Sequence, residues 1–167
     1  GGLYHSQSPE AYFAHTPGLK IVVPRNPHQA KGLLLAAIHD SNPTLFFEPK
    51  RLYRASVGEV PDEDYRLPLG EAEVTKEGTD VTILTVGATL YRATEAVKQL
   101  EDEFGLSVEL IDARSLVPFN YDPVIESIQK TRKIVLASDA CERGSVLQTM
   151  AAKITQLAFD ELDAPPV

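Results

Sequence analysis

The stretch DVTILTVGATLYRATEAVKQLEDEFGLSVELID, residues 80–112, decides the fold class of this chain. It begins with an apolar run that predicts a buried strand closed by Gly87. Apolar residues then recur at helical spacing, and Gly105 is placed where glycine commonly ends a helix. A second apolar run, 107–112, predicts the next strand. Strand, helix and strand in this order indicate a parallel pair in an α/β sheet.

The same alternation continues toward the C-terminus. YDPVIESIQK (121–130) predicts a helix, RKIVLASD (132–139) a strand, and SVLQTMAAKITQLAFDEL (145–162) a further helix. The residues of this last helix that we expect to face inward are Leu147, Met150, Ala151, Ile154 and Leu157. The closing LDAPPV resembles the approach to another strand. We therefore expect 80–167 to be a small doubly wound α/β domain, incomplete at its C-terminus.

A separate strand–helix–strand unit precedes this domain. LKIVVP (19–24) and TLFFEP (44–49) predict buried strands, and Asn26 and Pro27 are suited to cap and begin the helix between them. Apolar residues at helical spacing predict one buried face, formed by Ala30, Leu33, Leu34, Ala37 and Ile38. One such unit has too few strands to close a sheet. We therefore expect the chain to be a fragment of a longer polypeptide.

The segment between the two units mixes charges, prolines and glycines without a sustained period. We interpret residues 58–79 as a linker, with a short strand near 69–74. The predicted domains are accordingly 1–57 and 80–167.

The composition limits the function classes. Apolar residues make up 43% of the 167 residues, which is enough for a core. The formal net charge is −8 and the sequence has no Lys/Arg cluster, which argues against a nucleic-acid or anionic-membrane partner. No run reaches the roughly 20 apolar residues of a membrane helix. The single cysteine, Cys141, permits no internal disulfide and suits a reducing compartment.

Two short stretches carry candidate chemistry. His5 lies among Tyr4, Ser6, Gln7 and Ser8, a polar neighbourhood that suits either a catalytic histidine or an ordinary surface position. The other histidines, His15, His28 and His39, are interpreted as surface or packing residues.

The second stretch is IHDSNP (38–43), where a helix ends and its last carbonyls lack partners. Asp40 and Asn42 add side-chain oxygens two residues apart. Such a set suits either a hard cation or a polar helix stop, and local reasoning leaves both open.

Longer stretches add a family resemblance. YHSQSPEAYFAHTPGLKIVVPRNPHQAKGLLLAAIHDSNPTLFFEPKRLYR (4–54) closely resembles the beta subunits of the thiamine-diphosphate-dependent 2-oxo acid dehydrogenases. EGTDVTILTVGA, VELIDARSLVPFN and LDAP are similar to the same subunit's C-terminal domain. The branched-chain members match better than the pyruvate members. The resemblance implies the tail of a thiamine-type pyrimidine-binding domain, followed by a transketolase C-terminal-like domain.

The resemblance also implies an assembly and a reaction. Family members pair with alpha subunits as heterotetramers, hold thiamine diphosphate at the alpha–beta interface with magnesium on the alpha subunit, and acylate the lipoyl groups of an acyltransferase. Branched-chain 2-oxo acids are the expected substrates, with pyruvate, acetoin or 2-oxoglutarate as alternatives. A non-catalytic docking module is the alternative for the isolated chain, which we expect to be inactive and to self-associate. The expected location is the bacterial cytoplasm, or the mitochondrial matrix in a eukaryote.

Individual residues carry over by position. His5 matches the family's active-site histidine, and a group titrating near neutral pH can supply the proton that a departing dihydrolipoyl sulfur needs. The Ala37 carbonyl, Asp40 and Asn42 match a potassium site, although relatives often have cysteine at Ala37. Asp163 falls where relatives place a glutamate that contacts the acyltransferase's basic subunit-binding domain.

One family residue is missing. The glutamate that activates the aminopyrimidine ring lies upstream of His5 in the family, and neither Glu10 nor Glu48 matches it. The chain is therefore expected to hold only part of the cofactor site.

Overall fold

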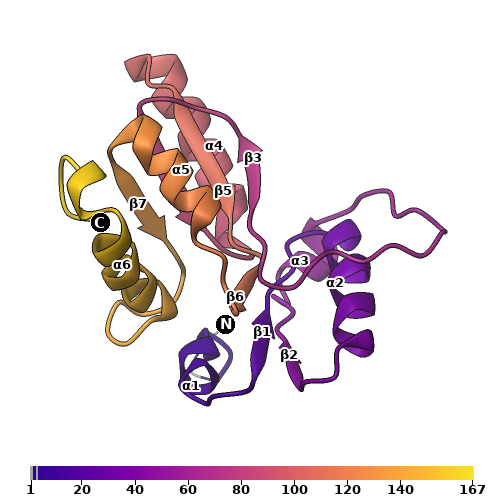
Figure 1. The fold of residues 1–167 in the computed structure, drawn as a ribbon. Coiled ribbons are helices and arrows are strands. Elements are labelled where there is room, and N and C mark those ends of the chain that lie inside the picture. The colour runs from indigo at the N-terminus through magenta and orange to yellow at the C-terminus, as the bar shows by residue number, and fades with distance from the viewer. Residues whose placement is uncertain (1, 3) are drawn as a thin grey trace.

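The structure, a computed structural model, describes residue 2 and residues 4–167. Its seven strands form two sheets that lie side by side (Figure 1). The strands are β1 (Lys20–Val22), β2 (Thr44–Phe46), β3 (Glu73–Lys76), β4 (Val81–Thr85), β5 (Val108–Asp112), β6 (Ser115–Val117) and β7 (Ile134–Ala137). The helices are α1 (Glu10–Ala14), α2 (Pro27–His39), α3 (Leu52–Ala55), α4 (Thr89–Phe104), α5 (Asp122–Thr131) and α6 (Val146–Leu157), followed by the 3-10 turn η1 (Phe159–Glu161).

The first sheet has the order β2-β1-β6. β1 and β2 are parallel and joined by α2, which confirms the predicted strand–helix–strand unit. Asn26 caps α2 by accepting a hydrogen bond from the Gln29 amide at 2.8 Å. The third strand, β6, comes from the second half of the chain and runs antiparallel to β1. The strand–helix–strand unit is thus extended to a three-stranded sheet by β6, a strand that the sequence did not predict.

The second sheet has the order β3-β5-β4-β7, and β4, β5 and β7 are mutually parallel. Alternation along the strands sends Ile83 and Leu110 toward α4, and sends Leu84 and Ile111 toward α5 and α6. Figure 1 shows α4 behind the sheet and α5 and α6 in front of it. Helices on both faces confirm the predicted doubly wound α/β architecture.

Both edges of the second sheet involve segments that looked irregular in the sequence. β3 lies within the range 58–79 predicted as a linker, overlaps the short strand predicted near 69–74, and pairs antiparallel with β5. At the other edge, the Val167 amide donates to the Ile134 carbonyl and the Leu136 amide donates to Val167. Val167 is therefore hydrogen-bonded beside β7, and the further strand expected there stays a prediction.

The predicted buried face of α2 is wrong in part. Leu33 is buried, but Leu34 is 44% and Ile38 is 67% exposed. Gln29, Gly32 and Leu33 form the buried side. Gln29 binds acids of the second sheet, and Gly32 lies against the segment that follows α3. A similar difference affects α6, where Leu157, expected to face inward, is 47% exposed.

The segment after α3 is held along α2. The Leu67 amide donates to the Gly32 carbonyl at 3.1 Å, and the Tyr65 hydroxyl donates to the His28 carbonyl at 2.7 Å. The Lys31 ammonium donates to the carbonyls of Asp62 and Glu63 at 3.2 and 3.0 Å. This part of the predicted linker is therefore an ordered strap, which we call the α2 strap (residues 61–67).

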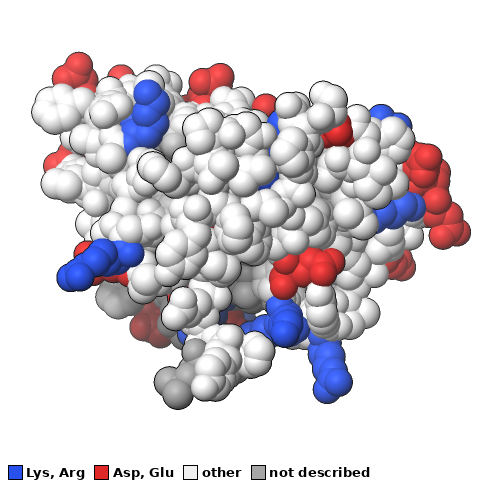
Figure 2. Space-filling model, turned by 90° about the horizontal axis from the view of Figure 1, so that it is seen from below, with Lys and Arg blue, Asp and Glu red and all other residues white. Residues whose placement is uncertain are grey.

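None of the helices in the described part of the chain is long and apolar enough to cross a membrane. Figure 2 shows one face of the molecule, on which basic side chains are scattered among acidic and uncharged ones. They form no continuous basic patch on that face.

Candidate active site

A cleft of about 1010 Å³ lies where the two sheets meet. Its walls come from the segments that directly follow β1, β2, β4 and β7, together with the start of α6. These are the carboxyl ends of the parallel strands, where α/β sheets commonly place their ligand sites. The cleft is therefore the candidate active site.

His5 lines this cleft and is exposed to it. It belongs to the segment 4–11, which runs along the cleft just before and into α1. The Ser8 hydroxyl donates to Asp139 Oδ1 at 3.0 Å and so ties this segment to the loop after β7. The candidate histidine from the first half of the chain thus faces a loop of the second half.

Glu10 is a cleft residue to which sequence reasoning gave no role. Burial raises the pKa of its carboxyl, and the nearby Asp139 carboxylate raises it further against a backbone hydrogen bond that lowers it. A carboxyl group of this kind keeps its proton to a higher pH than a solvent-exposed glutamate does. Glu10 and Asp139 lie 129 positions apart, so no local pattern could have paired them.

Another part of the cleft lining is basic. Lys50 and Arg51 follow β2, and Arg92 lies in the first turns of α4. All three side chains are exposed to the cleft. The sequence shows no basic cluster because these residues come from two segments about 40 positions apart.

A polar cluster outside the cleft lining joins the two halves of the chain. Arg25 Nε donates to Asp112 Oδ2 at 2.8 Å, and Gln29 Nε2 donates to the same oxygen at 2.9 Å. Glu73 Oε2 accepts from Gln29 at 2.7 Å and from Arg25 Nη2 at 3.3 Å. Burial raises the pKa of Asp112, against the opposing effects of Gln29 and Arg25.

Gly87 lies close to two residues of the first half of the chain. It has φ +58°, and a Cβ there would lie 3.0 Å from Val23 Cγ1 and 3.4 Å from Pro49 Cγ. Glycine at this position therefore lets the turn before α4 contact the ends of β1 and β2.

The predicted cation residues form a cluster at the end of α2, outside the residues that line the cleft. Asp40 Oδ1 accepts from the Asn42 amide at 2.8 Å and from Asn42 Nδ2 at 3.0 Å, while the Asp40 amide donates to the Ala37 carbonyl at 3.3 Å. Lys20 Nζ lies 2.5 Å from Asp40 Oδ2. The Lys20 and Asn42 hydrogen bonds lower the pKa of Asp40 to about 2.

Asp163, the predicted partner contact, is paired within the chain. Its Oδ1 accepts from Arg132 Nε at 2.8 Å, and its Oδ2 lies 3.8 Å from Lys133 Nζ. The side chain is 45% exposed, so part of the carboxylate still faces solvent.

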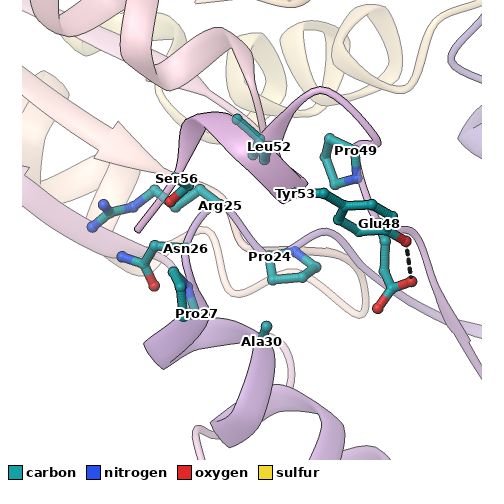
Figure 3. Close-up of a pocket in the computed structure, with 10 residues that line it drawn as sticks. All are labelled: Pro24, Arg25, Asn26, Pro27, Ala30, Glu48, Pro49, Leu52, Tyr53 and Ser56. Carbon is teal, nitrogen blue, oxygen red and sulfur yellow. Dashed lines mark hydrogen bonds between the residues drawn. The ribbon is translucent and has the colours of Figure 1, made fainter. Parts of the chain in front are cut away.

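A second, smaller pocket of about 240 Å³ adjoins the cleft (Figure 3). It is lined largely by Pro24, Pro27, Pro49, Leu52 and Tyr53. Glu48 lines both hollows, and its carboxylate accepts a hydrogen bond from the Tyr53 hydroxyl at 2.6 Å (Figure 3). This hydrogen bond raises the pKa of Tyr53.

Comparison with known proteins relates the two halves of the chain to two domain families. The family model of the transketolase C-terminal domain matches residues 70–167. The model of the transketolase pyrimidine binding domain matches residues 1–56.

Curated relatives are similar over nearly the whole chain. The beta subunit of mitochondrial 2-oxoisovalerate dehydrogenase from Dictyostelium discoideum is 48% identical, over 99% of this chain and 45% of the relative. The 2-oxoisovalerate dehydrogenase subunit beta of Bacillus subtilis is 47% identical, over 99% of this chain and 50% of the relative. The beta subunit of the acetoin:2,6-dichlorophenolindophenol oxidoreductase of the same bacterium is 45% identical, over 96% of this chain and 46% of the relative. The chain spans about half the length of these relatives.

A solved structure shares the fold. A split-gene transketolase, described as an inactive beta4 tetramer, superposes with a TM-score of 0.75 at 28% sequence identity. The match covers 94% of this chain and 49% of the other.

Proposed function

The chain belongs to the transketolase C-terminal domain family, and from this premise we propose that it forms part of the beta subunit of a branched-chain 2-oxo acid dehydrogenase. The observation that supports this most is the ordered match, over 99% of the chain, to 2-oxoisovalerate dehydrogenase beta subunits from a bacterium and a eukaryote. The activity needs the rest of the beta subunit and an alpha subunit. The compartment would be the cytoplasm of a bacterium or the mitochondrial matrix of a eukaryote.

Thiamine diphosphate, when bound at the alpha–beta interface with magnesium on the alpha subunit, would supply decarboxylation and carry the acyl group. The residues of this chain fit only one side of such a site, because the cleft offers His5 but no residue that matches the family's activating glutamate. This chain's part would be to hold the segment 4–11 against Asp139 through Ser8 and to present the His5 imidazole.

His5 would donate a proton to the lipoyl sulfur that departs as the acyl group is transferred. General acid help of this kind is typically worth ~10²–10⁴-fold in rate. Its exposure to the cleft supports the role, since the acceptor must arrive from solvent on another protein.

The test uses the full-length beta subunit expressed with its alpha partner. His5→Ala should lower lipoyl acylation by roughly 10²-fold or more, while decarboxylation measured with an artificial electron acceptor falls much less. His39→Ala is the matched control, because His39 is exposed on α2, lies outside the cleft lining and has its ring Nδ1 2.8 Å from the Leu35 carbonyl oxygen. Equal lipoyl acylation by wild type and His5→Ala would remove this role.

The substrate has a second candidate. The acetoin-oxidising relative is nearly as similar as the branched-chain one, at 45% against 47% identity within one bacterium. Rates of the assembled enzyme with 2-oxoisovalerate, pyruvate, 2-oxoglutarate and acetoin would decide between the substrates. A highest kcat/KM for acetoin would replace the branched-chain assignment.

A potassium ion at the end of α2 is a further part of the proposal. The Ala37 carbonyl, Asp40 and Asn42 supply oxygen ligands of the kind that hard cations prefer. Asp40 is now paired with Lys20, so the ion would share or replace that ammonium. We expect a higher melting temperature in potassium chloride than in tetramethylammonium chloride, and no such difference in Asp40→Asn. An equal potassium effect in that variant would count against the site.

Asp163 would contact the basic subunit-binding domain of the acyltransferase. Its half-exposed carboxylate supports this, although Arg132 and Lys133 would compete for it. Asp163→Asn should weaken capture of that domain by the assembled enzyme, and Asp160→Asn, another exposed acid nearby, should not. If neither variant changes capture of the subunit-binding domain, this chain contacts that domain through residues other than Asp163.

A further inference from the structure

We propose that Lys50, Arg51 and Arg92 form an anion-binding site on one wall of the cleft, for the carboxylate or phosphate of a small molecule. The proposal goes beyond the role of His5, since it concerns binding by other residues of the cleft, and anion binding there needs no catalytic turnover.

None of these three cations forms an ion pair with another of the described residues. The ion pairs among the described residues involve Lys20, Arg25, Lys76, Arg114, Lys130, Arg132 and Lys133. None of them involves Lys50, Arg51 or Arg92, although acidic residues outnumber basic ones by 24 to 16 in the sequence. Three cations without an ion pair therefore line one part of the cleft, where they can attract an anion.

Two contacts hold these cations on the same wall. Pro49, which precedes Lys50, packs against Gly87 just before α4. At the other end of α3, the Ser56 hydroxyl lies 2.7 Å from the Tyr91 hydroxyl, and Tyr91 also donates to the Arg25 carbonyl at 3.0 Å. Segment 49–56 is thus fixed along the start of α4, next to Arg92.

The start of α4 favours the same charge. This helix of 16 residues has no side-chain cap at its N-terminus and no acidic residue in its first turn. Thr89, its first residue, has a buried hydroxyl oxygen without a hydrogen-bond partner. An uncapped helix N-terminus adds a fixed positive partial charge to the three side chains.

The acids that line the cleft lie on other segments or are engaged in hydrogen bonds. Glu10 belongs to α1, and Asp139 to the loop after β7, where it accepts from Ser8. Glu48 precedes Lys50 by two positions, and its carboxylate accepts from Tyr53 at the side of the smaller pocket (Figure 3). The cations are therefore gathered beside the start of α4, which is the part of the cleft suited to an anion.

The ligand class follows from these groups. Two guanidinium groups can each bind an oxyanion through two parallel N–H groups, and the ammonium adds a point charge. Both the carboxylate of a 2-oxo acid and a phosphate group meet this requirement. The two sources are separated by titrating the chain with 2-oxoisovalerate and with inorganic phosphate.

The test is a chemical-shift titration of the backbone amides of the full chain at constant ionic strength, with chloride as the reference anion. We expect the amides of 87–92 to shift saturably with at least one probe. Saturation by 2-oxoisovalerate alone would identify a carboxylate site, and tighter saturation by phosphate would identify a phosphate site. No shift beyond that in chloride would overturn the proposal.

Variants localise the site. Arg92→Gln and Arg51→Gln should each weaken binding about tenfold, the value typical of losing one charge-assisted hydrogen-bond pair. Lys98→Gln is the matched control, since Lys98 is exposed on the same helix outside the cleft lining. Unchanged affinity in Arg92→Gln, Arg51→Gln and Lys50→Gln, each with the wild-type amide spectrum elsewhere, would also overturn the proposal. The role proposed for His5 would stand in either case, because it is tested by lipoyl acylation.

Discussion

Arg25 Nε lies 2.8 Å from Asp112 Oδ2, and this pair joins the loop after β1 to the end of β5. The Asp112 side chain is completely buried, and the Arg25 side chain is 18% exposed. Truncating one partner of such a pair leaves an uncompensated charge in the interior.

Arg25→Met should therefore lower the free energy of unfolding by about 3 kcal/mol at neutral pH, as measured by urea denaturation. Asp112→Asn should cost less, because a neutral amide oxygen can still accept from Gln29. The double variant should lose less than the sum of the two single losses. An Arg25→Met variant as stable as wild type would show that the pair does not hold the two halves together.

The Lys20–Asp40 pair predicts a dependence of stability on pH. The pKa of Asp40 is lowered from its usual 3.8 to about 2, with the Lys20 hydrogen bond as the largest cause. As pH falls, the unfolded chain binds the proton first, so the stabilisation is present above about pH 4 and is lost toward pH 2.

The urea midpoint of wild type should consequently fall more between pH 4 and pH 2.5 than that of Lys20→Met, which lacks the ammonium. A direct titration of the Asp40 carboxyl by NMR should give a midpoint well below pH 3.8 in wild type and a higher midpoint in Lys20→Met, where only the Asn42 hydrogen bonds remain. Parallel loss of stability in both proteins would assign the acid sensitivity to other carboxylates.

Gly78 has no room for a side chain. A Cβ there would lie 2.1 Å from the Val108 carbonyl carbon and 2.3 Å from the Glu109 amide nitrogen, both of which are backbone atoms. Gly78→Ala should destabilise the fold by at least the ~1–3 kcal/mol typical of overpacking, because backbone cannot move as side chains do.

Gly58→Ala is the matched control for this prediction. Its added Cβ would meet only Pro27 Cδ at 4.0 Å, so thermal unfolding should change little or shift slightly upward. Similar melting temperatures for Gly78→Ala and Gly58→Ala would contradict the close approach of Gly78 to the β5 backbone.

The α2 strap depends on Lys31. Its ammonium donates to the carbonyls of Asp62 and Glu63, and it lies 5.2 Å from the centre of the Tyr65 ring. Lys31→Met should release residues 61–67 and make this segment the first site of limited proteolysis, with faster cleavage than in wild type. Lys98→Met should leave the cleavage rate unchanged, and an unchanged rate in Lys31→Met would show that Tyr65 and Leu67 suffice to hold the strap.

The candidate site was only partly accessible to sequence reasoning. His5 is unremarkable locally, and only the run of residues that follows it made it a candidate. That Asp139 and Arg92 line the same cleft was not predicted, because both residues are remote from His5 in the sequence. Asp163 shows a different limit of sequence reasoning. Resemblance selected it as a partner contact, but it could not show that the carboxylate pairs with Arg132 of the same chain.

The sequence by itself determined the local elements. The period of apolar residues predicted β4, α4 and β5, Asn26 predicted the start of α2, and Gly105 predicted the end of α4, where it has φ +67°. These features depend on residues within one or two turns of each other, and that is why a single sequence reveals them.

Only the tertiary structure decided how these elements combine. It placed β6 beside β1, added β3 to the second sheet, and left Leu34 and Ile38 exposed on α2. It also brought His5, Glu10 and Arg92 to one cleft. Pairing of strands and burial of a face depend on which distant surfaces meet, and periodicity along the chain carries no information about that choice.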